Sequence, residues 1–382
     1  MIRRLILALA AAAALLGSAP PAAAIPRFAA RYGQTCILCH QDPTGGGLRS
    51  LYASQFLVPN ELVMARLPDS LIANIDPQVG KNLIVGADVQ TLYLATRRTP
   101  TESGFLQMQA TLYLDFHVGE RWSAQMVRRE QGDFQALGLG FVLPASGYVK
   151  VGRFWPAFGL RLEDHTAFVR RGLGYIPPTD SDTGLEMGVY PGAFYANAGV
   201  FNGELGSIFD NDRGRALLGR AGVRLRLGGL LVSGGGSVWR NPVSLGDTAG
   251  TRGTRVNYGP FGTLSLGPAT WLGEFDWSRL NTPTGHVTAL YFSQELSWRL
   301  CRGLDLLGTY DFADSDWSDG GNTQERFGAG LDARIYPCLR LGGRVNWGQF
   351  TAGYTDLVGT GQRDTEVVLT LLSADRATPS RG

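Results

Sequence analysis

The sequence predicts an all-β fold: an antiparallel transmembrane β-barrel of about 16 strands, preceded by a small, partly helical segment. Three observations predict it. Apolar and polar residues alternate along most of the chain from residue 82 onward, and the links between these segments are mostly short at one end and longer at the other. Glycine is also frequent, with 52 among 382 residues. This combination is typical of barrels of the outer-membrane type.

Residues 1–24 are expected to form a secretory signal peptide. Two arginines open the chain, an apolar run follows over residues 5–16, and three alanines at 22–24 match a cleavage site. The apolar run is shorter than the roughly 20 residues that a membrane-spanning helix needs. We therefore expect an exported chain whose mature form begins near Ile25.

The part that follows is expected to divide into a segment over 25–81, a barrel over 82–374 and a tail over 375–382. The segment over 25–81 mixes short helical patterns with turns and is punctuated by prolines. The change to strict alternation near residue 82 sets the boundary with the barrel.

Alternation is clearest over residues 105–118. Its even-numbered positions are apolar and its odd-numbered positions are mostly polar, with Phe105 and Tyr113 as exceptions. A period of two places the two sets on opposite faces of one strand. Sixteen such segments lie near residues 82–94, 105–118, 121–131, 134–143, 147–154, 183–191, 193–202, 214–227, 230–239, 255–266, 269–279, 287–299, 304–313, 325–336, 339–350 and 364–373.

The apolar face decides between a barrel and a soluble β-sandwich or solenoid. Either soluble fold needs one core face and one solvated face, whereas here an apolar face recurs on every strand and no helices are available to cover it. In barrels of this type the short turns face the periplasm. The segment over 25–81 therefore begins on the periplasmic side, where it either caps the barrel or enters the lumen as a plug.

Charge and motifs exclude several classes of function. The formal net charge is +2 and the pI is near 8.3, which is too neutral for a typical nucleic-acid binder. No Ser-His-Asp arrangement or pair of catalytic carboxylates stands out, so neither a hydrolase nor a transferase is expected.

The chemistry of the sequence is concentrated in Cys36, Cys39 and His40, which form a Cys-x-x-Cys-His motif. In an exported chain this spacing indicates covalent attachment of a c-type haem, with two thioethers and a histidine ligand to the iron. The alternatives are a disulfide, a redox-active cysteine pair and half of a zinc site. A second ligand pair for zinc and the βαβ context of a redox motif are both missing.

Further residues are candidates for the haem environment. Three glycines, Gly45, Gly46 and Gly47, either let the backbone approach the haem closely or form a tight turn. Met64 is a candidate for the second axial position, unless it only fills a core. His117 is the rival ligand if the segment enters the lumen, because the alternation places it on the inner face.

Two more cysteines, Cys301 and Cys338, lie in predicted short turns two strands apart. The compartment is oxidising, so a disulfide between them is expected, with two free thiols as the alternative.

The stretches FAARYGQTCILCH and PTGGGLR, followed by a barrel, resemble the fused monohaem cytochrome–porins of Gram-negative outer membranes, as does GRFWPAFGLRLEDHT at 152–166. The resemblance implies one covalent haem c and an electron-transfer protein. Its implied partners are outer-membrane lipid, a periplasmic cytochrome or other redox carrier, and an extracellular donor or acceptor such as Fe(II). After His40, the continuation QDPTGGGLRS departs from the pattern of the iron-oxidising members.

We therefore expect an electron conduit in the Gram-negative outer membrane, whose haem segment enters from the periplasmic side. A single haem cannot bridge a hydrocarbon core of about 30 Å. It should therefore lie in the lumen towards the outer side, or another carrier must relay the electrons. The alternative function is a porin-like solute channel with the haem segment as a plug or redox gate, because barrels of 16 strands can enclose aqueous channels.

Overall fold

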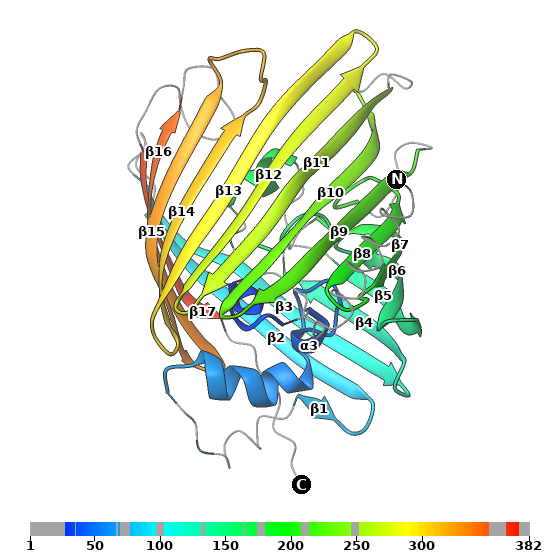
Figure 1. Ribbon diagram of the computed structural model, residues 1–382, viewed down its shortest axis with the longest axis vertical. Coiled ribbons are helices and arrows are strands. Elements are labelled where there is room, and N and C mark those ends of the chain that lie inside the picture. The colour runs from blue at the N-terminus through cyan, green and yellow to red at the C-terminus, as the bar shows by residue number, and fades with distance from the viewer. Residues whose placement is uncertain are drawn as a thin grey trace, which may run out of the picture.

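The strands form one closed antiparallel sheet in the computed structural model (Figure 1). The structure describes residues 27–34, 36–65, 68, 77–96, 103–130, 134–162, 164, 166–173, 180–207, 214–245, 252–350 and 364–373. The predicted signal peptide and C-terminal tail lie outside these residues. Within them, no helix has the length and apolar character needed to span a membrane.

Sixteen long strands follow one another around the barrel, each pairing with its neighbours in sequence, and β17 closes the ring by pairing with β2. The predicted all-β, 16-stranded fold is confirmed. The strands are β2 (Leu83–Thr96), β3 (Ser103–Val118), β4 (Trp122–Arg129), β5 (Phe134–Leu143), β6 (Gly147–Phe154), β7 (Asp182–Val189), β8 (Phe194–Phe201), β9 (Ala216–Leu227), β10 (Leu230–Ser244), β11 (Arg252–Leu266), β12 (Ala269–Thr282), β13 (Gly285–Cys301), β14 (Leu304–Asp314), β15 (Thr323–Tyr336), β16 (Leu339–Phe350) and β17 (Asp364–Ser373).

A seventeenth strand, β1 (Gln78–Val79), pairs with the start of β2. Sequence reasoning missed it because two residues are too few to show a period. The largest difference from the predicted bounds is at the end of β10, which extends to Ser244 and so further towards the loop before β11. A strand end that extends beyond the lipid needs no apolar outer face. The alternation of apolar and polar residues therefore stops there, although the hydrogen-bonded pairing continues.

The two faces of the barrel differ as the alternation predicts. On β3, Leu112 and Phe116 are about half exposed on the outer face, whereas Thr111 and Asp115 are buried on the inner face. Tyr113, the exception in the sequence pattern, is also on the inner face and is only 4% exposed. An apolar side chain buried inside the barrel requires something in the lumen to pack against it.

The longest loop links β6 and β7, and its residues 155–162, 164 and 166–173 fold into the lumen and fill part of it. Its short helix α5 (Phe168–Leu173) packs against β12, β13 and β14. Leu160 N–H donates to Glu274 at 2.8 Å, and Arg170 makes a 2.5 Å ion pair with the same carboxylate. The loop thus forms a core with the inner wall and narrows the barrel.

Asp164 anchors this loop to the neighbouring strands β15 and β16. Its carboxylate lies 2.5 Å from the guanidinium of Arg344 and 3.5 Å from that of Arg326, and it accepts a hydrogen bond from the N–H of Thr166 at 2.8 Å. Burial raises the pKa of this carboxyl, but Arg344 and Arg326 outweigh burial and hold it below the usual value. The stability from this anchor is therefore fully present above about pH 4 and is lost as the pH falls below that value.

Asp164→Asn is expected to loosen the loop, because it removes charged hydrogen bonds that contribute about 2 kcal/mol. Trypsin should then cut after Arg170 faster than in the unchanged protein. Asp319→Asn, in an exposed turn, is the control and should leave the cleavage rate unchanged. Equal rates for the two variants would show that Asp164 does not hold the loop.

Candidate functional site

The N-terminal segment lies inside the barrel at the end that carries the short turns (Figure 1). Its elements are α2 (Arg27–Tyr32), α3 (Cys36–Cys39) and the π-helix η1 (Ala53–Leu62). We call residues 27–34 and 36–65 the inner segment. In the figure its first part, in dark blue, lies within the barrel, and η1 lies across the opening below.

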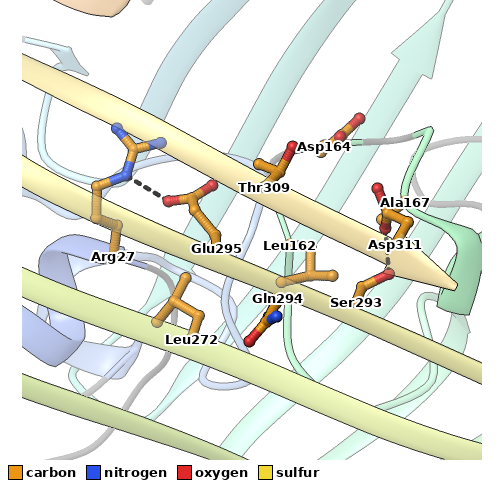
Figure 2. A pocket seen from close by; sticks show the side chains of 10 residues that line it. All are labelled: Arg27, Leu162, Asp164, Ala167, Leu272, Ser293, Gln294, Glu295, Thr309 and Asp311. Carbon is orange, nitrogen blue, oxygen red and sulfur yellow. Dashed lines mark hydrogen bonds and ion pairs between the residues drawn. The ribbon is translucent and has the colours of Figure 1, made fainter. Parts of the chain in front are cut away.

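Ion pairs fix the start of the inner segment to one side of the wall. Arg27 is only 2% exposed and contacts Glu295 at 2.7 Å and Asp332 at 2.6 Å. Arg31 pairs with Asp305 at 2.7 Å. Figure 2 shows Arg27 pointing at Glu295 in a pocket that residues of the loop over 155–181 also line. The inner segment and the loop therefore meet inside the lumen.

A second anchor lies on the other side, at Lys150 of β6. Its ammonium group is fully buried and lies 3.2 Å from the carboxylate of Asp42 and 3.0 Å from that of Glu186. Thr44 and Tyr148 complete the network, with Thr44 Oγ1 3.1 Å from the ammonium and the Tyr148 hydroxyl donating to Glu186 at 2.8 Å. Burial raises the pKa of Asp42, but nearby cations, Lys150 first, outweigh burial and lower it.

Three glycines follow the motif and the anchor residues Asp42 and Thr44 in the chain. Gly45, Gly46 and Gly47 all have positive φ, at 89°, 82° and 65°, a region that other residues rarely adopt. A Cβ on Gly45 would lie 2.9 Å from the Cys36 sulfur, and one on Gly46 would lie 2.8 Å from the ring of Trp155. Gly45 therefore lies close to a motif cysteine and Gly46 close to Trp155 of the loop after β6, and the close approach to a haem stays a prediction.

The motif itself occupies one helical turn. His40 N–H donates to Cys36 C=O at 2.7 Å, so both thiols and the imidazole project from the same turn. Cys36 is 5% exposed, and Cys39 is half-buried. Burial raises the pKa of the Cys39 thiol to about 11, Cys36 adds to the rise, and Arg49 opposes it. At neutral pH, Cys39 therefore keeps its proton.

The two candidates for the second axial position lie at the short-turn end. Met64 N–H donates to Arg334 C=O at 2.8 Å, which fixes this residue at the rim, and its side chain is 43% exposed. His117 lies 3.2 Å from the carboxylate of Asp115 on the inner face of β3. Asp115 also lines a cavity beside Gly45–Gly47, so that wall adjoins the glycine stretch. Ligation by either residue stays a prediction.

The disulfide expected between Cys301 and Cys338 is not formed, since both residues are free and exposed. Cys301 ends β13, and Cys338 lies in the turn between β15 and β16. Strands are about 4.8 Å apart, so two intervening strands separate these residues by more than the roughly 7 Å that a disulfide tolerates. Turns two strands apart are neighbours, but not close enough for this bond.

Several residues that hold the site were not predicted from the sequence. Asp42, Lys150 and Glu186 gave no signal, because a buried ion pair between distant segments leaves no periodic trace. Tyr113 did give one, as an apolar residue on an otherwise polar face. It packs against Gly47, where an added Cβ would lie 3.4 Å from its ring.

Solved structures with the same architecture are outer-membrane porins. An anion-selective porin from Comamonas acidovorans matches with a TM-score of 0.59 and 14% identity, over 76% of this chain and 99% of that one. The fold is that of an outer-membrane porin. OprB of Pseudomonas putida matches with a TM-score of 0.59 and 10% identity, over 77% of this chain and 94% of that one.

OmpT of Vibrio cholerae matches with a TM-score of 0.56 and 13% identity, over 78% of this chain and 99% of that one. These porin chains are covered almost completely, whereas part of this chain has no counterpart in them. No family model and no curated protein matches the sequence. The likeness therefore concerns the barrel.

Proposed function

We propose that this protein is a Gram-negative outer-membrane electron conduit, in which one covalent c-type haem is held within a porin-like barrel. The observation that carries the proposal is the position of the Cys-x-x-Cys-His motif. It lies inside the barrel, in a segment fixed to the wall on two sides by buried ion pairs.

The residues present fit a c-type haem. Two thiols and an imidazole on one helical turn are the donor set for two thioethers and one iron ligand. The glycines at 45–47 bring backbone rather than side chains against Cys36. When bound, such a haem takes up and releases one electron at a time.

The chain's own residues would then have separate roles. Cys36 and Cys39 would hold the haem covalently, His40 would ligate the iron, and Met64 would be the candidate for a second ligand. The ion pairs of Arg27 and Lys150 keep the segment in one position. The loop over 155–181 limits water in the lumen.

The position of the motif near the short turns determines which electron-transfer partners it needs. In an outer-membrane barrel that end faces the periplasm, so a periplasmic cytochrome or another redox carrier can approach the site. The hydrocarbon core is about 30 Å thick, so a further carrier must reach an extracellular donor or acceptor such as Fe(II).

The experiment is a spectrum of the purified protein. The reduced protein is expected to show a c-type haem that remains on the polypeptide in a denaturing gel. Cys36→Ala/Cys39→Ala should lose it completely, because no thioether can form. Cys301→Ala/Cys338→Ala, with the same number of thiols removed, should keep it. A wild-type protein without haem would rule out the conduit.

The fold favours a second candidate, a solute channel in which the inner segment is a plug or redox gate. The support is the structural likeness to porins, one of which is described as anion-selective. Planar-bilayer recordings separate the two functions. A large, stable, ion-selective current through the intact protein supports the channel, and near-silence supports the conduit.

A further inference from the structure

Charged side chains inside this barrel are mostly paired. Arg27, Arg170, Arg326, Arg340 and Arg344 each make an ion pair with a carboxylate. Such pairing is expected, because an unpaired charge removed from water costs several kcal/mol.

Arg220 and Arg224 on β9 depart from this rule. They are 7% and 8% exposed, and within the described part of the chain neither makes an ion pair with a carboxylate. The Nε of each residue and the Nη2 of Arg224 are buried donors that find no acceptor there. Arginine stays protonated in proteins, so two unneutralised charges lie side by side in the wall.

The local sequence builds this cationic pair. Arg220, Gly222 and Arg224 share the inner face of β9, because side chains alternate along a strand. A Cβ at Gly222 would lie 2.3 Å from the hydroxyl of Tyr195 on β8. Glycine therefore lets the Tyr195 ring lie across the strand, with the Arg220 and Arg224 guanidinium carbons 5.3 Å and 4.8 Å from its centroid. The ring separates the two cations but accepts no conventional hydrogen bond from them.

The pair lies on the part of the wall beside the segment that carries the haem motif. Helix α2, which ends four residues before Cys36, packs against β10, and β10 pairs with β9. Gly33, three residues before Cys36, lies against Leu231 and Arg226 at the β9–β10 end of the wall. The two free cations are thus on the wall beside the predicted attachment site.

We propose that Arg220 and Arg224 bind the two propionate carboxylates of the haem attached at Cys36 and Cys39. The inference rests on the proposed function and adds to it the residues that receive the acidic edge of the cofactor. The number of charges matches, since there are two guanidinium groups for two carboxylates. A guanidinium is also the side chain whose planar fork fits a carboxylate in a bidentate manner. The buried N–H groups of both arginines then gain acceptors.

The test is the reduction potential of the haem in the full-length protein. The double variant Arg220→Gln/Arg224→Gln removes two positive charges beside the propionates, which favours the oxidised state. We expect at least a tenfold change in the ratio of oxidised to reduced haem at a fixed electrode potential, which is a fall of about 59 mV for one electron. Arg252→Gln, which removes an exposed arginine at the start of β11, at the other end of the barrel, is the control and should change the ratio less than twofold.

The conservative variant Arg220→Lys/Arg224→Lys retains the charge and should recover most of the potential. If the double glutamine variant does not fold, Arg224→Gln alone should change the ratio about threefold. A potential equal to that of Arg252→Gln in the folded variants would overturn the assignment.

Two further outcomes distinguish a failure of the proposed function from a failure of this inference alone. Absence of haem from the wild-type protein would refute the proposed function and this inference together, whereas haem with an unchanged potential in the variants refutes the inference alone. Succinate is the probe for carboxylates that come from solution. With the propionates bound, added succinate should leave the wild-type potential unchanged, and a succinate-dependent shift would show that the arginines bind solute anions instead.

Discussion

Lys150→Met is expected to destabilise the folded protein by about 3–5 kcal/mol, the cost of removing one partner of a buried ion pair. The substitution leaves Glu186 and Asp42 facing each other without the cation that joins them. The side chains of Lys150 and Glu186 are both inaccessible to water, so solvent cannot compensate. Urea unfolding in detergent, followed by tryptophan fluorescence, measures the loss.

Two variants control this experiment. Lys81→Met changes the other lysine, which is exposed in the turn before β2, and should leave the unfolding midpoint unchanged. Lys150→Met/Glu186→Gln removes one of the two carboxylate charges left without the cation and should recover part of the stability. If Lys150→Met unfolded at the same urea concentration as Lys81→Met, the network would not anchor the inner segment.

Deletion of residues 27–76 is expected to convert a nearly silent barrel into one that carries a stable ion current. The inner segment closes the short-turn end through contacts on several sides of the wall, and a barrel of 16 strands without such a segment can hold an aqueous channel. The deletion removes one partner of Lys150 and the partners of the wall carboxylates that pair with Arg27 and Arg31. Water in the open lumen hydrates these charged groups instead, so the barrel remains stable. Planar-bilayer conductance is the measurement.

Weakening only the anchor at Arg27 and Arg31 should give a conductance between that of the full-length protein and that of the deletion variant. Arg27→Met/Arg31→Met should produce intermittent openings, because the anchor at Lys150 still holds the segment. A full-length protein that conducts as well as the deletion variant would contradict the blocked lumen and would favour the channel function.

The strands could be predicted from the sequence because their physical cause is local. Each strand has one face towards lipid and one towards the lumen, so residues such as Leu112 and Phe116 repeat with a period of two. The same cause explains why the ends of β10 and the two-residue strand β1 were missed. Pairing there does not depend on an apolar outer face.

The contacts that position the site could not be predicted, because they join residues far apart in the chain. Lys150 and Asp42 are separated by 108 positions, and nothing near either residue indicates its partner. The disulfide prediction failed for a related reason. The order of turns along the chain gives the neighbours of Cys301, but the spacing of the intervening strands decides which bonds can form.

The long-range pairs of Arg27 also determine the order in which the molecule can assemble. Arg27 and Asp332 are 305 residues apart, so the inner segment cannot dock until the last strands of the barrel have been made and brought next to the first. Until then Cys36, which is 5% exposed in the finished fold, remains accessible to enzymes. Any covalent modification of that thiol therefore belongs to the stage before the barrel closes, and closure seals the modified segment inside.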